Sequence, residues 1–231
     1  MTMSVRAGVI AIVAVALGVG LAGCGSDTKT EPSATESTSS EATSTSAAAS
    51  DAPAPAGKPK YTIVDYIRDS GIVEAPVKRG DPGSPTIDLP FPPGWESAGP
   101  RTPEWAYGAL VSTDPAFAQS PPTIIALVSK LTGNVEPAKI LEFAPGEIQN
   151  LPGYQGNDAG TPSQLSGFDA VVIAGGYTKD GLKRAIAQKT VVIPGQDGLY
   201  VLQLNADGLE DQMPALMEAT AVIDEQTKIV P

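Results

Sequence analysis

The sequence contains no histidine and only one cysteine, Cys24. The absence of histidine excludes Ser-His-Asp and Cys-His catalysis, histidine-ligated zinc and pH switching through an imidazole. A lone cysteine excludes disulfides within the chain, and once modified it leaves no thiol for soft metals or redox chemistry. The chemistry that stays open is that of carboxylates, lysine, tyrosine and hard metal ions.

Basic residues are also scarce, since 15 Lys and Arg stand against 26 Asp and Glu and the net charge is −11. The acidic residues are scattered along the chain, and there is no basic stripe of the kind that contacts phosphates. This balance argues against nucleic acid as a partner. It also makes adhesion to anionic lipid headgroups unfavourable.

The N-terminus has the layout of a secretory signal peptide. One basic residue, Arg6, precedes the run GVIAIVAVALGVG, which is too short for a comfortable membrane span. The run leads into Leu-Ala-Gly-Cys, a lipobox whose cysteine can carry a diacylglyceryl group. We therefore predict cleavage of residues 1–23 and fatty acylation of Cys24, with palmitate among the acyl chains. The alternative is a plain signal peptide followed by an incidental cysteine.

Residues 24–59 are almost wholly Ser, Thr, Ala and Pro with a few acids. Such a segment has no apolar face to bury, so nothing offsets the entropy of ordering it, and we predict a flexible tether. Residues 60–231 are predicted to form a single globular domain of ordinary size. The acyl chains would hold this domain at the outer face of the cytoplasmic membrane, on the periplasmic side of the cell envelope.

Hydrophobic periodicity predicts helices at residues 62–69, 136–151 and 207–225. Thr62 and Asp65 form a plausible capping box for the first helix, and Pro145 is expected to interrupt the second. The third is predicted to begin at Asp207 as its N-cap, with Glu210 completing a capping box. Its predicted buried stripe comprises Leu209, Met213, Leu216 and Ile223.

Extended segments or strands are predicted at residues 72–78, 86–91, 107–112, 123–131, 168–177, 182–193 and 199–205. The run TIIALVSKL at 123–131 is typical of a strand buried on both faces. Asp180-Gly181 predicts a hairpin turn between two of the later strands. Because hairpins dominate, the predicted fold class is α+β, an antiparallel sheet covered by helices.

The candidate residues for contact with a ligand or partner are aromatic: Trp95, Trp105, Tyr107, Phe143 and Tyr154. Several lie in loops rich in Pro and Gly, where an aromatic ring can line a concave site or an interface. The same rings can instead close one end of the core. The sequence leaves both roles open.

No catalytic residue, metal ligand or cofactor site is predicted. The string Asn-Ala-Asp-Gly at 205–208 resembles a calcium loop, but Gln203 and Pro214 stand where the EF-hand pattern requires acids. Helix capping explains this string better. The carboxylates include no obvious pair at catalytic spacing, and the G-x-S-x-G motif of a nucleophile elbow is missing.

Several segments resemble a known family: PTIDLPFPPGW, TIIALVSKLTG, EPAKILEFAPGE, AQKTVVIP and LNADGLEDQMPALMEATAVIDEQTKI. Together with the lipobox they resemble the mycobacterial lipoproteins of the LpqN/LpqT type, with the LpqN branch closest. The likeness covers the chain from about Tyr61 onward. It implies lipidation of Cys24 and a Mog1/PsbP-like fold, in which a central antiparallel sheet is sandwiched between α-helices.

The resemblance also implies a role without catalysis, as an accessory in building the cell envelope. The implied partners are MmpL-type lipid transporters and secreted mycolyl-handling proteins, and the implied ligand is an acylated trehalose or another glycolipid. Two alternatives stay open. One is a hydrolase of envelope glycolipid esters or glycosides that uses carboxylates or a Ser/Lys pair, and the other is a structural lipoprotein without a ligand.

Overall fold

The computed structural model describes residues 58–231. The predicted signal peptide, Cys24 and nearly all of the predicted tether lie outside the described residues. Helices in the described part are α1 (Ile63–Asp69), α2 (Pro137–Phe143), α3 (Pro145–Gln149) and α4 (Met213–Gln226), with short 3-10 turns at Gly99–Arg101, Pro115–Phe117 and Glu210–Gln212. Within residues 58–231 no helix has both the length and the apolar character needed to cross a membrane.

The strands form one large antiparallel sheet and one small ribbon. They are β1 (Val73–Pro76), β2 (Thr86–Asp88), β3 (Trp95–Ser97), β4 (Gly108–Ser112), β5 (Thr123–Thr132), β6 (Gln155–Gly156), β7 (Thr161–Leu165), β8 (Phe168–Lys179), β9 (Leu182–Pro194), β10 (Leu199–Leu209) and β11 (Lys228–Val230). The nine-stranded sheet has the order β3-β4-β5-β10-β9-β8-β6, with β1 also paired to β5 and β7 to β8. β2 and β11 form the ribbon.

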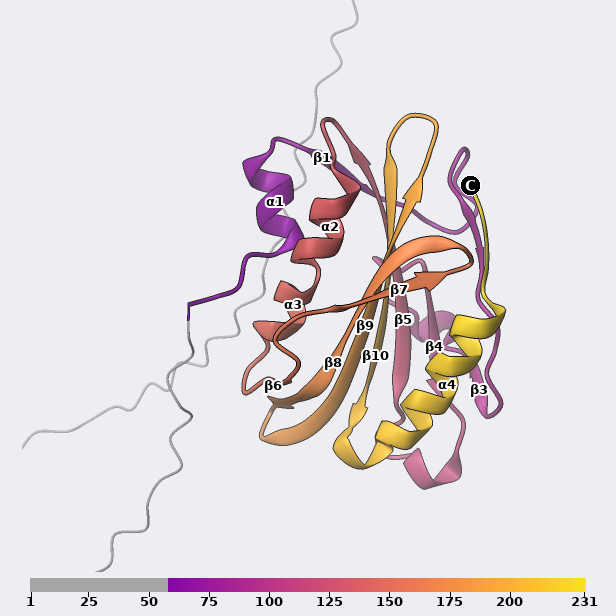
Figure 1. Cartoon of the computed structure of the whole chain (residues 1–231). Coiled ribbons are helices and arrows are strands. Elements are labelled where there is room, and N and C mark those ends of the chain that lie inside the picture. Colours follow the sequence, from indigo (N-terminus) through magenta and orange to yellow (C-terminus); the bar gives the residue numbers. More distant parts are fainter. Residues whose placement is uncertain (1–57) are drawn as a thin grey trace, which may run out of the picture. The chain divides into compact units, whose positions relative to one another are not determined.

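Both faces of the sheet are covered. Successive side chains of a strand point to opposite faces, and β9 contributes Val191 and Ile193 to one core cluster and Val192 to another. The first cluster includes Leu216 of α4, and the second includes Ile140 of α2. Figure 1 shows the result, with α1, α2 and α3 on one side of the sheet and α4 on the other. The predicted α+β class with an antiparallel sheet is confirmed.

Three local predictions are confirmed. Thr62 accepts a hydrogen bond from the Asp65 N–H at 3.2 Å, and the Asp65 carboxylate accepts one from the Thr62 N–H at 3.0 Å, which completes the capping box of α1. The predicted second helix is divided into α2 and α3 at Pro145. In the β8–β9 hairpin, Asp180 and Gly181 have φ values of 52° and 75°, which a turn of this type requires.

The predicted start of the last helix is wrong. Asp207 lies in β10, where its carboxylate accepts hydrogen bonds from the Arg184 guanidinium, one of them from Nε at 2.7 Å. The helix α4 begins at Met213 and follows a 3-10 turn. The Gln212 side chain caps this turn by accepting a hydrogen bond from the Leu209 N–H at 2.8 Å. A charge pair across two strands therefore replaces the local capping box.

Other differences concern exposure and short strands. In the predicted stripe of the last helix, Leu216 and Ile223 are buried, but Met213 is 40% exposed because the helix begins later than expected. β5 buries one face, while its other face is only half-buried. The strands β3, β6, β7 and β11 lie outside the predicted extended segments, and each is a run of five residues or fewer.

A buried lysine links α4 to the sheet. Lys189 lies in β9 beneath α4, and its Nζ is 2.6 Å from an Asp224 carboxylate oxygen. We expect Asp224→Asn to lower the free energy of unfolding by about 1–3 kcal/mol, because the buried ammonium would lose its charged hydrogen-bond partner. Urea unfolding of the full chain measures this change.

The adjacent residue offers a matched control. Glu225 is exposed on the same turn of α4, so we expect Glu225→Gln to change the free energy of unfolding by no more than about 0.5 kcal/mol. Equal losses for the two variants would contradict a specific role for the Lys189 pair.

Candidate functional site

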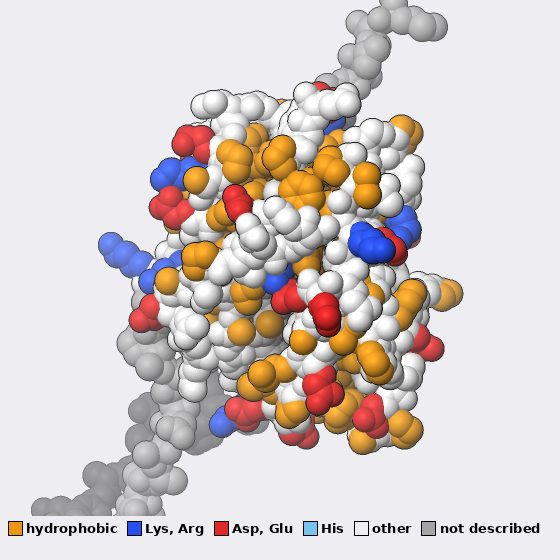
Figure 2. All heavy atoms as spheres, turned by 45° about the vertical axis from the view of Figure 1, so that its right-hand side comes forward, with side chains coloured by type: hydrophobic (Ala, Val, Ile, Leu, Met, Phe, Trp, Pro, Cys, Tyr) orange, Lys and Arg blue, Asp and Glu red, His pale blue; other side chains and the backbone are white. Residues whose placement is uncertain are grey.

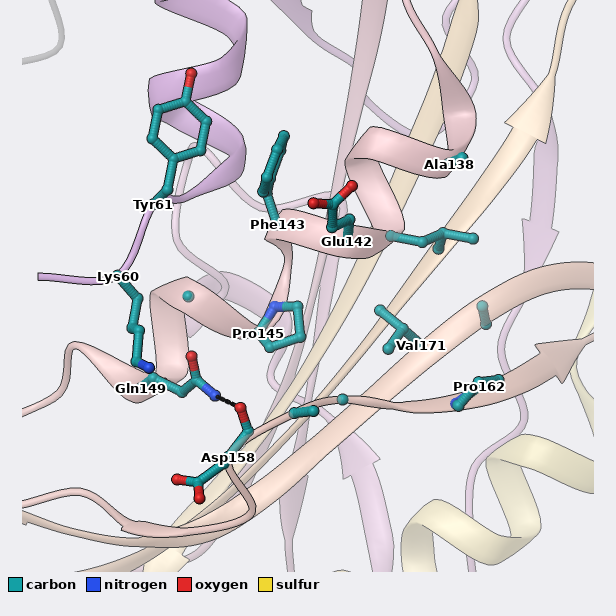
Figure 3. A pocket seen from close by; sticks show the side chains of 15 residues that line it. Lys60, Tyr61, Ala138, Glu142, Phe143, Pro145, Gln149, Asp158, Pro162 and Val171 are labelled. Carbon is teal, nitrogen blue, oxygen red and sulfur yellow. Dashed lines mark hydrogen bonds between the residues drawn. The ribbon is translucent and has the colours of Figure 1, made fainter.

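A groove of about 540 Å³ lies on the side of the sheet that carries α2 and α3. It is bounded by the segment before α1, the two helices, the start of β7 and a part of β8, and Figure 3 shows it from close by. The lining residues are Lys60, Tyr61, Ala138, Leu141, Glu142, Phe143, Pro145, Gly146, Gln149, Asp158, Ala159, Gly160, Pro162, Ala170 and Val171.

The groove has an apolar wall and a polar end. Phe143 from α2 and Val171 from β8 belong to the apolar wall, whereas Lys60, Gln149 and Asp158 gather at one end, as Figure 3 shows. Small-molecule sites commonly combine apolar walls with a few polar groups that fix orientation. This arrangement suits an amphipathic ligand.

Two glycines allow the walls to approach each other. A Cβ at Gly146 would overlap the carbonyl group of Tyr61, so only glycine lets α3 pack against the incoming chain. A Cβ at Gly160 would overlap the Val171 side chain and lie 2.7 Å from Cγ of Pro145. Because glycine has no Cβ, α3 can contact the segment before α1, and the segment before β7 can contact β8 and Pro145.

Hydrogen bonds fix the polar end of the groove. The Lys60 N–H donates to Asn150 Oδ1 at 2.7 Å, and Asn150 Nδ2 donates back to the Lys60 carbonyl at 2.8 Å. Gln149 Nε2 donates to the Asp158 carbonyl at 2.8 Å, which ties α3 to the segment before β7. The chain thus enters the described domain at the groove, held by α3.

Phe143 is the predicted aromatic residue that lines this groove. Its ring meets that of Tyr61 edge-on with centroids 4.8 Å apart, and that of Tyr66 at 5.7 Å. The Lys139 ammonium lies 5.4 Å from the Phe143 centroid. These contacts hold the ring between α1 and α2.

Tyr154 lies on the same side of the sheet but packs beneath α3 rather than in the groove. It packs against a cluster that contains Ile148 and Tyr177, and its hydroxyl donates to the Ala174 carbonyl at 3.1 Å. Burial raises the pKa of the Tyr154 hydroxyl above its ordinary value. The ring therefore closes part of the core.

The remaining candidate aromatics belong to the opposite side or to the surface. Trp95 is buried and borders a hollow of about 300 Å³ beside α4. Tyr107 is buried, accepts a hydrogen bond from the Ile87 N–H at 3.3 Å and lies 5.2 Å from the Arg79 guanidinium. Trp105 is 57% exposed. The five aromatics do not form one site, and their contact with a ligand or partner stays a prediction.

A second feature on the groove side of the sheet is a cluster of polar side chains, which we call the Glu147 cluster: Glu147, Gln188, Gln203 and Asn205. Glu147 Oε2 accepts hydrogen bonds from Gln203 Nε2 at 2.8 Å and Gln188 Nε2 at 3.2 Å. Gln188 Nε2 also donates to Asn205 Oδ1 at 3.0 Å. The cluster joins α3 to β9 and β10.

The sequence holds weak signals for these features. Gln188 interrupts the run AIAQKTVVI and Gln203 interrupts VLQLNA, so each places a carboxamide where strand periodicity expects a buried residue. The partner Glu147 is 41 positions from Gln188, and no local pattern joins them. The groove is assembled from similarly distant segments.

The described residues define a class of protein. It is a domain with one antiparallel sheet, helices on both faces and an open groove with an apolar wall beside the point where the chain enters. The family described as "Probable lipoprotein LpqN" matches residues 59–230. The chain belongs to the LpqN lipoprotein family.

LpqN of Mycobacterium tuberculosis is similar to this chain both in sequence and in structure. Lipoprotein LpqN of Mycobacterium tuberculosis (strain ATCC 25618 / H37Rv) is 56% identical over 176 residues, which cover 76% of this chain and 77% of the relative. A crystal structure of LpqN, described as involved in cell envelope biogenesis of M. tuberculosis, has a TM-score of 0.72 and 56% sequence identity. It covers 75% of this chain and 99% of the solved chain.

Glu147 makes stability depend on pH. Burial raises the pKa of this carboxyl above its ordinary value and nearby Glu74 adds to the rise, while hydrogen bonds from Gln203 and Gln188 oppose it. The folded protein therefore binds this proton more tightly than the unfolded chain, so stability falls as pH rises through the folded pKa. We expect Glu147→Gln to gain stability relative to the unchanged protein as pH rises.

Urea unfolding of both proteins between about pH 4 and pH 8 tests this expectation. The same substitution at exposed Glu225 serves as the control and is expected to show no comparable trend. A constant difference between Glu147→Gln and the unchanged protein across this range would contradict the buried-carboxyl explanation.

Proposed function

We propose that this chain is a non-catalytic, lipid-anchored binding module in cell-envelope biogenesis, and that its groove holds a glycolipid such as an acylated trehalose. The groove itself carries the proposal. An acyl chain would lie along the apolar wall formed by Phe143 and Val171, and sugar hydroxyls would face Lys60, Gln149 and the Asp158 end. The role in envelope biogenesis is supported by the M. tuberculosis homologue.

The position of the groove relative to the anchor supports the same function. The relative is named a lipoprotein, and the lipobox at Cys24 would attach this chain to the outer face of the cytoplasmic membrane. The chain from Cys24 enters the described domain at Lys60, which is itself a groove residue. A ligand taken from the membrane would thus meet the groove at the tethered end.

We further propose that MmpL-type lipid transporters and secreted mycolyl-handling proteins dock on the α4 side. Figure 2 shows hydrophobic side chains in scattered groups on the face turned forward, with acidic side chains among them. Met217 on α4 is 64% exposed, and Phe91 near the β2 ribbon is 61% exposed. These exposed apolar side chains are the ones that a partner on this side would cover.

The groove gives little support to the alternative of a hydrolase. No serine is among the residues that line it in the described part of the chain. Glu142 at its rim is engaged by Lys139, whose Nζ lies 2.8 Å from a carboxylate oxygen. The helices on both faces of the antiparallel sheet support a finer fold assignment, which we propose to be Mog1/PsbP-like.

Filling the groove tests ligand binding. Ala138 is exposed on α2 and lines the groove, so we expect Ala138→Trp to occupy the space of the acyl chain without disturbing the core. Affinity for a monoacyl trehalose, measured by isothermal titration calorimetry, is expected to fall at least ~10-fold.

Ala221→Trp is the matched control, because Ala221 is exposed on α4 away from the groove. Equal affinities for the two variants would exclude the groove as the binding site. Mass spectrometry of the ligand after incubation covers the alternative function, since release of free fatty acid would show hydrolysis.

Replacing the proposed lipid-bearing residue tests the anchor. We expect Cys24→Ala to abolish incorporation of radiolabelled palmitate and to leave the signal peptide uncleaved, because the residue that carries the lipid is lost. Ser26→Ala leaves the lipobox intact and is expected to be labelled and cleaved as the unchanged protein is. Unchanged palmitate labelling of Cys24→Ala would contradict the proposed anchor.

A further inference from the structure

Glu147 is a half-buried carboxylate without a cation beside it. Both of its hydrogen bonds within residues 58–231 come from neutral carboxamides and reach a single oxygen, Oε2. None of the ion pairs formed by the described residues includes Glu147. A charge that has lost part of its hydration without gaining an opposite charge is costly, and a cationic group would compensate it.

Two buried oxygen atoms of β9, one of them in the Glu147 cluster, also lack hydrogen-bond partners among the described residues. Gln188 is 4% exposed, and its Oε1 is buried and unpartnered although its Nε2 is bonded within the cluster. Thr190, two residues along β9 and on the same face, is 1% exposed and has an unpartnered Oγ1. Buried polar atoms are normally hydrogen-bonded, so these oxygens mark a place for donors.

Next to the Glu147 cluster, β10 pairs with β5. Gln203 stands opposite Leu127 of β5, and Asn205 stands opposite Ile125. The side chains of Gln203, Asn205, Leu127 and Ile125 are half-buried, so this part of the sheet face is partly exposed. A ligand approaching from this side would first meet an apolar surface and then oxygen atoms.

Other charges on this face leave the cluster negative. Glu74 of β1 accepts a hydrogen bond from Ser129 at 2.7 Å on the same face and raises the pKa of Glu147. Arg184 of β9 also lies on this face, but its guanidinium is bound by Asp207. Arg184 is therefore engaged by Asp207, and no described cation is paired with Glu147.

We propose that the Glu147 cluster binds the guanidinium group of an arginine side chain from a partner protein. A guanidinium has five N–H donors and no acceptor, which matches a carboxylate beside the side-chain amide oxygens of Gln188 and Asn205. The aliphatic stem of the same side chain would lie on Ile125 and Leu127. This site shares no residue with the groove, so the inference goes beyond the proposed glycolipid function and does not rest on it.

Short peptides test the proposal on the full chain, held in uncharged maltoside micelles. The probes are the blocked tripeptide Gly-Arg-Gly and its citrulline counterpart, which has nearly the same shape without the charge. The readout is the NMR signals of the side-chain amides of Gln188, Gln203 and Asn205. We expect saturable shifts with the arginine peptide and at least ~10-fold weaker binding of the citrulline peptide. Affinity should increase as pH rises through the pKa of Glu147, because binding requires the ionised carboxyl.

Variants test whether the arginine peptide binds at the Glu147 cluster. Glu147→Gln and the isosteric Gln203→Met are expected to abolish the shifts while backbone spectra stay dispersed, and Glu225→Gln on α4 is expected to bind as the unchanged protein does. Equal binding of the citrulline peptide, no shift, or binding retained in Glu147→Gln would overturn the proposal. Ethylguanidinium tests whether the bound guanidinium belongs to a protein side chain or to a small free cation. Binding as tight as that of the arginine peptide would indicate a small cation and overturn the assignment to a protein partner.

Discussion

The architecture depends on central strands that bury both of their faces. In β9, Val191 and Ile193 are 0% exposed on one face, and Val192 is 5% exposed on the other. A strand of this kind is stable only when each face is covered, so the chain must supply cover twice. It does so with α1, α2 and α3 on one side and with α4 and the β2–β11 ribbon on the other (Figure 1).

Because both faces of these strands are buried, a few polar side chains beneath the helices contribute to holding the helices on the sheet. Lys189 in β9 lies beneath α4 and needs the Asp224 carboxylate, whereas Gln188 next to it points to the other face and meets Glu147. A polar side chain in these strands gains stability from a partner under the covering layer, because leaving a buried polar atom unpaired is costly, as it is for Thr190 Oγ1. The covering helices are thus held by specific polar contacts as well as by apolar packing.

The sequence predicts those parts of the fold that depend only on interactions between residues a few positions apart. Thr62 and Asp65 satisfy each other three positions apart, and the Asp180-Gly181 turn needs only a backbone with positive φ. Asp207 shows the limit of such reasoning. The string Asp-Gly-Leu-Glu is a favourable helix start in isolation, but β10 pairs with β9 in a register that brings Asp207 within reach of Arg184. A contact 23 positions away in the sequence decided the structure there.

The functional surfaces were harder to predict than the fold, for the same reason. Aromatic residues, several of them in loops, were the predicted contacts with a ligand or partner. Of these, Trp95 and Tyr107 lie in the core on the α4 side, and only Phe143 lines the groove. The groove depends instead on small residues such as Gly160, whose significance appears only when Pro145 and Val171 are seen against it. Close approach between distant segments leaves no periodic signal in the sequence.

The helix α3 connects these observations. It has five residues, far fewer than an isolated helix needs to be stable in water, so its position depends on contacts with the rest of the domain. On one side Asn150 and Gln149 hold it to Lys60 and to the segment before β7, which shapes the groove. From its other side Glu147 reaches β9 and β10. Because one short element carries both sets of contacts, the groove and the Glu147 cluster share a common structural support, and a change that displaces α3 alters both.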